Sequence, residues 1–181
     1  MKRQLCVNFF GGPGVGKTTA ASSLFVALKK LNIDTEIVSE FAKDLVLENN
    51  RDALQHQWYV IAQQSYRLHC GYRSMQVVIC DSPILLGPIY DPDGSRALYS
   101  LCLEHHHRFN NFNIVLRRDP NLQFSQAGRV HGLTESISLD YRIIRLLDDN
   151  NIPYVETIGW SAQSEWAVLQ EIQSHLSGNN V

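Results

Sequence analysis

The chain has 181 residues, which suits one α/β domain and leaves little room for two. Its net charge is −2, from 16 Lys and Arg against 18 Asp and Glu, so no overall field draws it to nucleic acid or to an anionic membrane. No apolar run is long enough for a membrane span or a signal-peptide core, and the four cysteines include no CxxC pair. We therefore expect a cytoplasmic protein that does not bind membranes and has no zinc site.

Short apolar runs alternate with segments of helical periodicity, which predicts a mostly parallel sheet covered by helices on both faces. The predicted strands cover residues 5–10, 35–39, 76–80, 113–116 and 153–158. The predicted helices cover residues 17–31, 40–48, 53–73, 95–110, 139–149 and 164–176. Residues 82–90 contain two prolines and a glycine and should form no long regular helix. The expected fold class is therefore a three-layer α/β/α fold with a five-stranded parallel sheet.

The division of the chain follows from the same pattern. We predict a single domain over residues 1–176 and a flexible tail at 177–181. Residues 117–138 are rich in Gly, Asn, Gln and Ser, and they are predicted to form a mobile excursion between the fourth strand and the next helix. Such an excursion suits a lid that closes over a ligand and excludes water.

Residues 11–18 have the sequence GGPGVGKT and match the phosphate-loop (P-loop) pattern G-x-x-x-x-G-K-[ST] without a gap. The motif follows a predicted strand and opens a predicted helix, so backbone N–H groups and the helix N-terminus would point at the phosphates of ATP. Lys17 would reach the β- and γ-phosphates, and the Thr18 hydroxyl would bind Mg²⁺. The alternative is a glycine-rich turn that binds nothing. The candidate phosphate-binding residues are Gly11, Gly12, Pro13, Gly14, Val15, Gly16, Lys17, Thr18 and Thr19.

Two carboxylates follow the second and third predicted strands. Asp81 comes directly after the apolar run VVIC, where P-loop enzymes place an acid near Mg²⁺, and Glu40 follows the strand at 35–39. Because the carboxyl ends of parallel strands open onto one crevice, both could face a phosphate acceptor and take its hydroxyl proton. Asp81 and Thr18 are the predicted metal ligands, and the choice of base between Glu40 and Asp81 stays open. The alternatives are a turn-forming Asp and a solvated Glu in the first turn of a helix.

Three arginines lie in or beside the predicted lid. Arg117 and Arg118 follow the strand at 113–116, and Arg129 lies in the glycine-flanked segment QAGRVHG. Phosphoryl transfer spreads negative charge over the transferred group, and arginines stabilise that charge. We therefore predict this role for all three, the alternative being a solvated loop with incidental charges.

Two other clusters have simpler explanations. The run EHHHR at 104–108 contains possible metal ligands, but consecutive helical residues point in different directions, so a solvated helix end is expected. Trp58, Tyr59 and Tyr66 have helical spacing and are expected in the core, with stacking on a nucleobase as the alternative.

The order of the motifs resembles that of a known group. GGPGVGKTT, VSEFAKD, QxxxIAQQ, VVICDSP, AGR and DNNIPY together resemble the small P-loop kinases related to ribosylnicotinamide kinase, including phage-encoded AAA-type members of similar size. The resemblance implies a P-loop NTPase sheet with strand order 2-3-1-4-5, with Glu40 and Asp81 flanking the acceptor hydroxyl and Arg129 in the lid. The segment CDSP lacks a second Asp two residues after Asp81, and the lid lacks a Trp, so nicotinamide riboside is not the expected substrate.

The motifs and the resemblance together predict an ATP- and Mg²⁺-dependent kinase that phosphorylates a hydroxyl of a nucleoside, a nucleotide or a related base. One alternative is a kinase acting on a hydroxymethyl base, such as 5-hydroxymethyluracil, within DNA. The net charge argues mildly against it, because phosphate contacts usually need several Lys or Arg. Another alternative is a switch or motor NTPase without a small acceptor. The expected partners are a nucleoside triphosphate and the acceptor, and a homodimer is possible.

Overall fold

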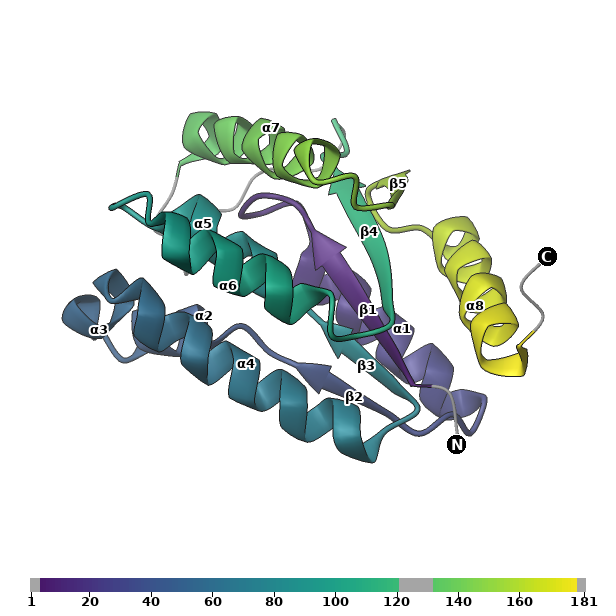
Figure 1. Cartoon of the computed structure of the whole chain (residues 1–181). Coiled ribbons are helices and arrows are strands. Elements are labelled where there is room, and N and C mark those ends of the chain that lie inside the picture. The colour runs from purple at the N-terminus through teal and green to yellow at the C-terminus, as the bar shows by residue number, and fades with distance from the viewer. Residues whose placement is uncertain (1–3, 121–131, 179–181) are drawn as a thin grey trace.

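The computed structural model describes residues 4–120 and 132–178, and its core is a five-stranded sheet. The strands lie in the order β2-β3-β1-β4-β5, and each neighbouring pair is parallel (Figure 1). This confirms the predicted sheet and its strand order. The strands are β1 (Leu5–Phe10), β2 (Thr35–Val38), β3 (Val77–Cys80), β4 (Asn111–Arg117) and β5 (Val155–Ile158).

Helices cover both faces of the sheet, as expected for parallel strands joined by crossover helices (Figure 1). α1 and α8 pack against one face, and α4, α6 and α7 contribute to the hydrophobic cluster on the other. The helices are α1 (Lys17–Lys30), α2 (Phe41–Leu47), α3 (Arg51–Gln55), α4 (Gln57–Ser74), α5 (Gly87–Tyr90), α6 (Arg96–His106), α7 (Leu133–Asp149) and α8 (Ala162–Ser177), with a 3₁₀ turn η1 (Ile84–Leu86) before α5.

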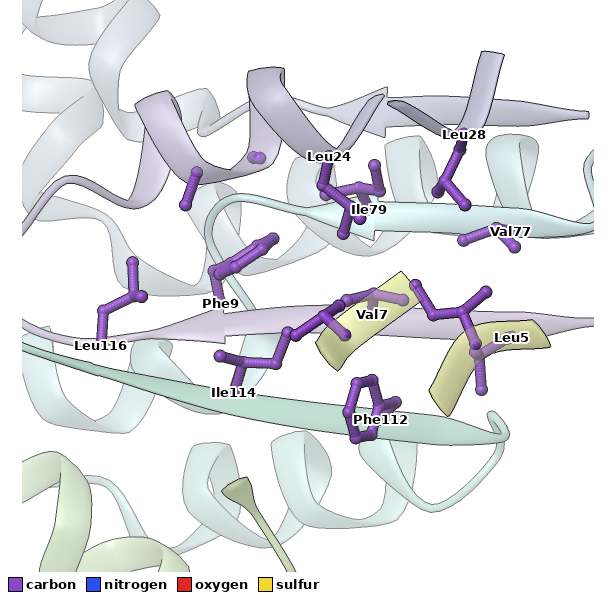
Figure 2. Packing of buried hydrophobic residues seen from close by; sticks show 14 of the residues in the cluster. Leu5, Val7, Phe9, Leu24, Leu28, Val77, Ile79, Phe112, Ile114 and Leu116 are labelled. Carbon is purple, nitrogen blue, oxygen red and sulfur yellow. The ribbon is translucent and has the colours of Figure 1, made fainter. Parts of the chain in front are cut away.

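The alternation of side chains along β1 explains why both faces need covering. Leu5, Val7 and Phe9 point to the side of α1 and α8, where they pack with Leu24, Leu28 and neighbouring apolar side chains (Figure 2). Cys6 and Phe10 belong to the clusters on the opposite side. Every residue of β1 is buried, so the strand that leads into the phosphate loop is fixed on both faces.

Asn8 is the one polar side chain of β1, and its hydrogen bonds explain why it can be buried. Its Nδ2 donates to Asn111 Oδ1 at 2.9 Å and to Asn113 Oδ1 at 3.0 Å on β4. Asn113 in turn donates to the Pro153 carbonyl at 2.9 Å. A buried amide with partners costs little, so the polar break in the first strand does not end it.

Several predicted boundaries are wrong. α7 begins at Leu133 rather than 139, so the second part of the expected excursion at 117–138 is helical. Leu139 and Ile143 anchor this helix in the core, and Glu135 accepts a hydrogen bond from the Gly132 amide in its first turn. The helix expected at 53–73 is broken at His56 into α3 and α4. Residues 121–131, in the middle of the predicted lid, lie outside the described residues.

Two of the side-chain predictions are also wrong. Trp58, Tyr59 and Tyr66 are exposed on α4, because Val60, Ile61, Gln64 and Leu68 form its buried face. In the histidine run, His106 is 5% exposed and burial lowers its pKa to about 4, so this helix end is not simply solvated. No group of three or more His, Cys, Asp or Glu in the described part of the chain is arranged to hold a metal ion. Within the same residues, no helix combines the length and apolarity that crossing a membrane requires.

Candidate active site

The phosphate loop joins β1 to α1, and glycines give it its shape. Gly14 and Gly16 have φ angles of 80° and 101°, a region that residues with a Cβ rarely adopt. Gly16 is the N-cap of α1 and has a left-handed backbone conformation. The helix therefore starts at Lys17, and the free backbone amides of its first turn are directed at the loop. The motif therefore folds as its sequence predicts, into a strand, a tight loop and a helix N-terminus.

Lys17 lies across the mouth of the loop. Its Nζ donates to the carbonyl of Gly11 at 2.7 Å and to that of Gly12 at 3.1 Å. Burial lowers its pKa, and the nearby carboxylates of Glu40 and Asp81 act in the opposite direction. The ammonium group is thus held at the loop and interacts electrostatically with both carboxylates.

Thr18 and Asp81 form a pair of oxygen donors next to Lys17. The Thr18 hydroxyl donates to Asp81 Oδ2 at 2.7 Å, and Asp81 is only 4% exposed. The other oxygen, Oδ1, is buried and has no hydrogen-bond partner among the described residues. An unpartnered buried carboxylate oxygen beside a hydroxyl fits Mg²⁺, which prefers hard oxygen ligands and usually takes only one or two from the protein.

Glu40 is the N-cap residue of α2, at the end of β2. Its carboxylate has no hydrogen-bond partner in the described part of the chain, although it is only partly exposed. Burial raises the pKa of Glu40, Lys17 lowers it, and Asp81 raises it further. The helix that follows is held in place by Gln64, whose Oε1 accepts from the Phe41 amide at 3.0 Å. Glu40 is therefore a carboxylate at a fixed helix N-terminus whose oxygens accept no hydrogen bond from the described residues.

Arg118 approaches the loop from the end of β4, together with an acid that the sequence did not point to. Its Nε and Nη2 lie 2.6 and 3.3 Å from the two oxygens of Asp140 on α7, and Nη2 donates to the Pro13 carbonyl at 3.1 Å. Asp140 Oδ1 also accepts from the Gly12 amide at 2.6 Å. One ion pair therefore ties β4 and α7 to the phosphate loop.

The other two predicted arginines are not placed at the loop by the structure. Arg117 pairs with Glu156 on β5 at 2.7 Å, and this hydrogen bond raises the pKa of its guanidinium. Arg129 lies outside the described residues. Of the predicted catalytic residues, the structure thus brings together Lys17, Glu40, Asp81 and Arg118.

A cleft of about 830 Å³ opens beside the phosphate loop and Glu40. Its far wall comes from α2, α3, α4, η1, α5, α7 and the adjoining loops, and it combines apolar side chains with polar ones such as Gln57, Gln64 and Arg142. Tyr90 also lines it, and burial raises the pKa of its phenol, with Glu40 acting in the same direction. Trp58, Tyr59 and Tyr66 are not part of its lining. The apolar residues of this wall are Val46, Leu54, Val60, Ile61, Pro83, Ile84, Leu86, Ile89, Pro92 and Leu139.

The chain matches a family model described as an AAA domain over residues 6–163, so it belongs to this AAA domain family. No curated protein sequence matches it. The family assignment covers β1 to β5 and therefore every residue of the site described above.

Several solved structures, two of them of kinases, share the fold. The M. mycoides deoxyadenosine kinase has 18% identity and a TM-score of 0.58, covering 93% of this chain and 99% of that one. Ehrlichia chaffeensis thymidylate kinase has 16% identity and a TM-score of 0.61, covering 94% and 100%. The NadR protein in complex with NR has 15% identity and a TM-score of 0.70, covering 99% of this chain and 53% of that one. At these identities the likeness shows that this chain has the P-loop kinase fold.

The second glycine of the loop gives a test of the site's packing. A Cβ on Gly12 would lie 2.6 Å from Asp140 Oδ1 and 2.6 Å from the Ser136 carbonyl, so Gly12→Ala must push the loop and α7 apart. We expect this variant to lose about 1–3 kcal/mol of unfolding free energy in urea titrations and to bind Mg·ATP at least about tenfold more weakly by calorimetry.

Gly132→Ala is the matched control, because no atom lies within 4 Å of its added Cβ and its φ of −77° suits alanine. It should leave both quantities close to those of the unchanged protein. A Gly12→Ala protein with normal stability and normal affinity would contradict the packing described here.

Proposed function

We propose that this protein is an ATP- and Mg²⁺-dependent kinase that transfers the γ-phosphoryl group to a hydroxyl of a nucleoside, a nucleotide or a related base. The observation that carries the proposal is the Glu40 carboxylate, which has no hydrogen-bond partner among the described residues, interacts electrostatically with Lys17 and Asp81, and lines the same cleft as Lys17 and Thr18. A regulatory NTPase needs the loop and the acid of β3, but it has no need of a second carboxylate or of an apolar acceptor wall.

The loop would bind the triphosphate through its backbone amides and the N-terminus of α1, with Lys17 moving from the Gly11 and Gly12 carbonyls to the more strongly accepting phosphate oxygens. Thr18 and Asp81 would hold Mg²⁺, which would supply positive charge to neutralise the triphosphate. Arg118 would add a cation beside the loop at Pro13.

Glu40 is the better candidate for the base that the sequence left undecided. One oxygen of Asp81 is already bound to Thr18, and its other oxygen fits the metal. In the proposed step the acceptor oxygen attacks the γ-phosphorus and its proton passes to Glu40. The bond from the γ-phosphorus to the bridging oxygen breaks, and ADP leaves. The raised pKa of Glu40 makes it a stronger base than an ordinary carboxylate while it is ionised.

The cleft favours an acceptor with a flat apolar face and polar edges, such as a nucleobase, because aliphatic side chains line it together with polar ones such as Gln57, Gln64 and Arg142. The solved structures that share the fold include a deoxyadenosine kinase and a thymidylate kinase, which supports an acceptor of the nucleoside or nucleotide class. The DNA alternative gains no such support, since Arg67 is paired with Asp44 and Arg108 with Glu104 rather than left for a strand of phosphates.

Incubation with labelled ATP and a panel of nucleosides, nucleotides and hydroxymethylated DNA, followed by mass spectrometry, tests the proposal. We expect Mg²⁺-dependent transfer to at least one free nucleoside or nucleotide. Lys17→Ala should lower the rate by about 100-fold or more, because it removes a cation from the developing charge. Lys30→Ala, at the other end of α1, serves as the control and should be neutral. ATP hydrolysis without transfer to any member of the panel would refute the kinase proposal.

The pH dependence of turnover tests Glu40. A base must be ionised, so the rate should fall as the pH drops through the pKa of Glu40, and this acid limb should lie above 4.5 because the pKa is raised. Glu40→Gln should lower kcat by about 100-fold or more and remove the limb. Glu48→Gln, at the other end of α2, is the control. An unchanged acid limb in Glu40→Gln would assign the base to another group.

A further inference from the structure

Asp140 makes three contacts that none of the proposed steps uses. Its Oδ1 accepts from the Gly12 amide at 2.6 Å and lies 3.3 Å from Arg118 Nη2, and its Oδ2 accepts from Arg118 Nε at 2.6 Å. The carboxylate therefore bridges the phosphate loop and the arginine at the end of β4. The ion pair is largely enclosed, with the Arg118 and Asp140 side chains 20% and 18% exposed.

The geometry fixes the direction in which Arg118 points. A guanidinium group that binds a carboxylate through Nε and Nη2 is held in one plane, because both bonds must be satisfied together. In this plane Nη2 also reaches the Pro13 carbonyl at 3.1 Å, which sets the cation against the loop. Removing Asp140 would take away the two hydrogen bonds that hold the guanidinium group in this plane.

The surroundings of Asp140 leave little room for adjustment. Ser136 lies one turn earlier on α7 and is fully buried, and its carbonyl and Asp140 Oδ1 would each lie 2.6 Å from a Cβ at Gly12. α7 is anchored below this turn by Leu139 and Ile143 in the core. The carboxylate is therefore held by a rigid helix, which is how a group that orients another residue should be supported.

We propose that Asp140 is a positioning residue, which aims Arg118 at the transferred phosphoryl group and holds the Gly12 peptide in register with the rest of the loop. The inference rests on the proposed kinase function. Because misplacing a charge-stabilising group by about 1 Å can cost about 100-fold in rate, loss of the bridge should act on the chemical step. Asp140 itself would not touch the nucleotide.

Asp140→Asn separates the two functions of the Asp140 carboxylate, which are the hydrogen bond to Gly12 and the ion pair with Arg118. The amide keeps an acceptor for the Gly12 N–H but loses the charge and one of the acceptors for Arg118. Turnover of Mg·ATP, measured as phosphoryl transfer to the nucleosides and nucleotides of the panel above, should fall about 10- to 100-fold in kcat. KM for ATP should change less than about threefold. The asparagine still accepts the hydrogen bond from the Gly12 amide, so the loop that would bind the phosphates keeps its contact with α7.

The double variant tells positioning from a general structural role. If Asp140 acts through Arg118, Asp140→Asn should lower kcat less than about twofold further in an Arg118→Ala background. Asp149→Asn on the same helix, where the exposed carboxylate pairs with Arg145, is the control and should leave kcat unchanged. Circular dichroism melts of all variants show whether each is folded at the assay temperature.

The possible results separate the two proposals. An unchanged protein that transfers no phosphoryl group to any member of the panel would overturn the kinase function, and this inference with it. Normal turnover in Asp140→Asn, or independent losses that multiply in the double variant, would overturn the positioning role and leave the kinase function standing.

Discussion

The close contact between Gly12 and α7 is the constraint on which the rest of the site depends. With no side chain at position 12, the loop can approach the Ser136 carbonyl and the Asp140 carboxylate of α7 closely enough for a hydrogen bond. The same carboxylate binds Arg118 from the end of β4. Three segments that are far apart in the chain are thereby joined at the phosphate loop. The start of the phosphate loop is thus held in place by α7 and β4 without a nucleotide, which lowers the cost of ordering it on binding.

The parallel sheet explains why the chemical groups gather beside this loop. β1, β2 and β3 are neighbours and point the same way, so the residues after their carboxyl ends meet at one edge. Lys17 and Thr18 follow β1, Glu40 follows β2, and Asp81 follows β3. Asp81 accepts a hydrogen bond from Thr18, whereas Glu40 has no hydrogen-bond partner among the described residues. This difference supports separate roles for two similar acids, with Asp81 as a metal ligand and Glu40 as the base.

The parts of the site that the sequence predicted are those set by local geometry. The phosphate loop is a contiguous motif, and Glu40 and Asp81 stand at strand ends that apolar runs identify. Asp140 was missed because its role depends on contacts with Gly12 and Arg118, which are 128 and 22 residues away. The predicted helix began at 139, one residue before Asp140. The turn of α7 that packs against Gly12 was therefore assigned to the expected excursion. Trp58 and Tyr66 were misplaced for a related reason, since helical spacing does not reveal which face of α4 the sheet covers.

The central claim is that the loop between β1 and α1 binds a polyphosphate together with Mg²⁺. Isothermal titration of the full chain with ATP, with and without Mg²⁺, tests it most directly, and adenosine provides the comparison ligand without phosphates. The account predicts saturable binding of one ATP per chain that strengthens with Mg²⁺, and much weaker binding of adenosine. Equal affinity for ATP and adenosine, or no binding of ATP under either condition, would contradict it.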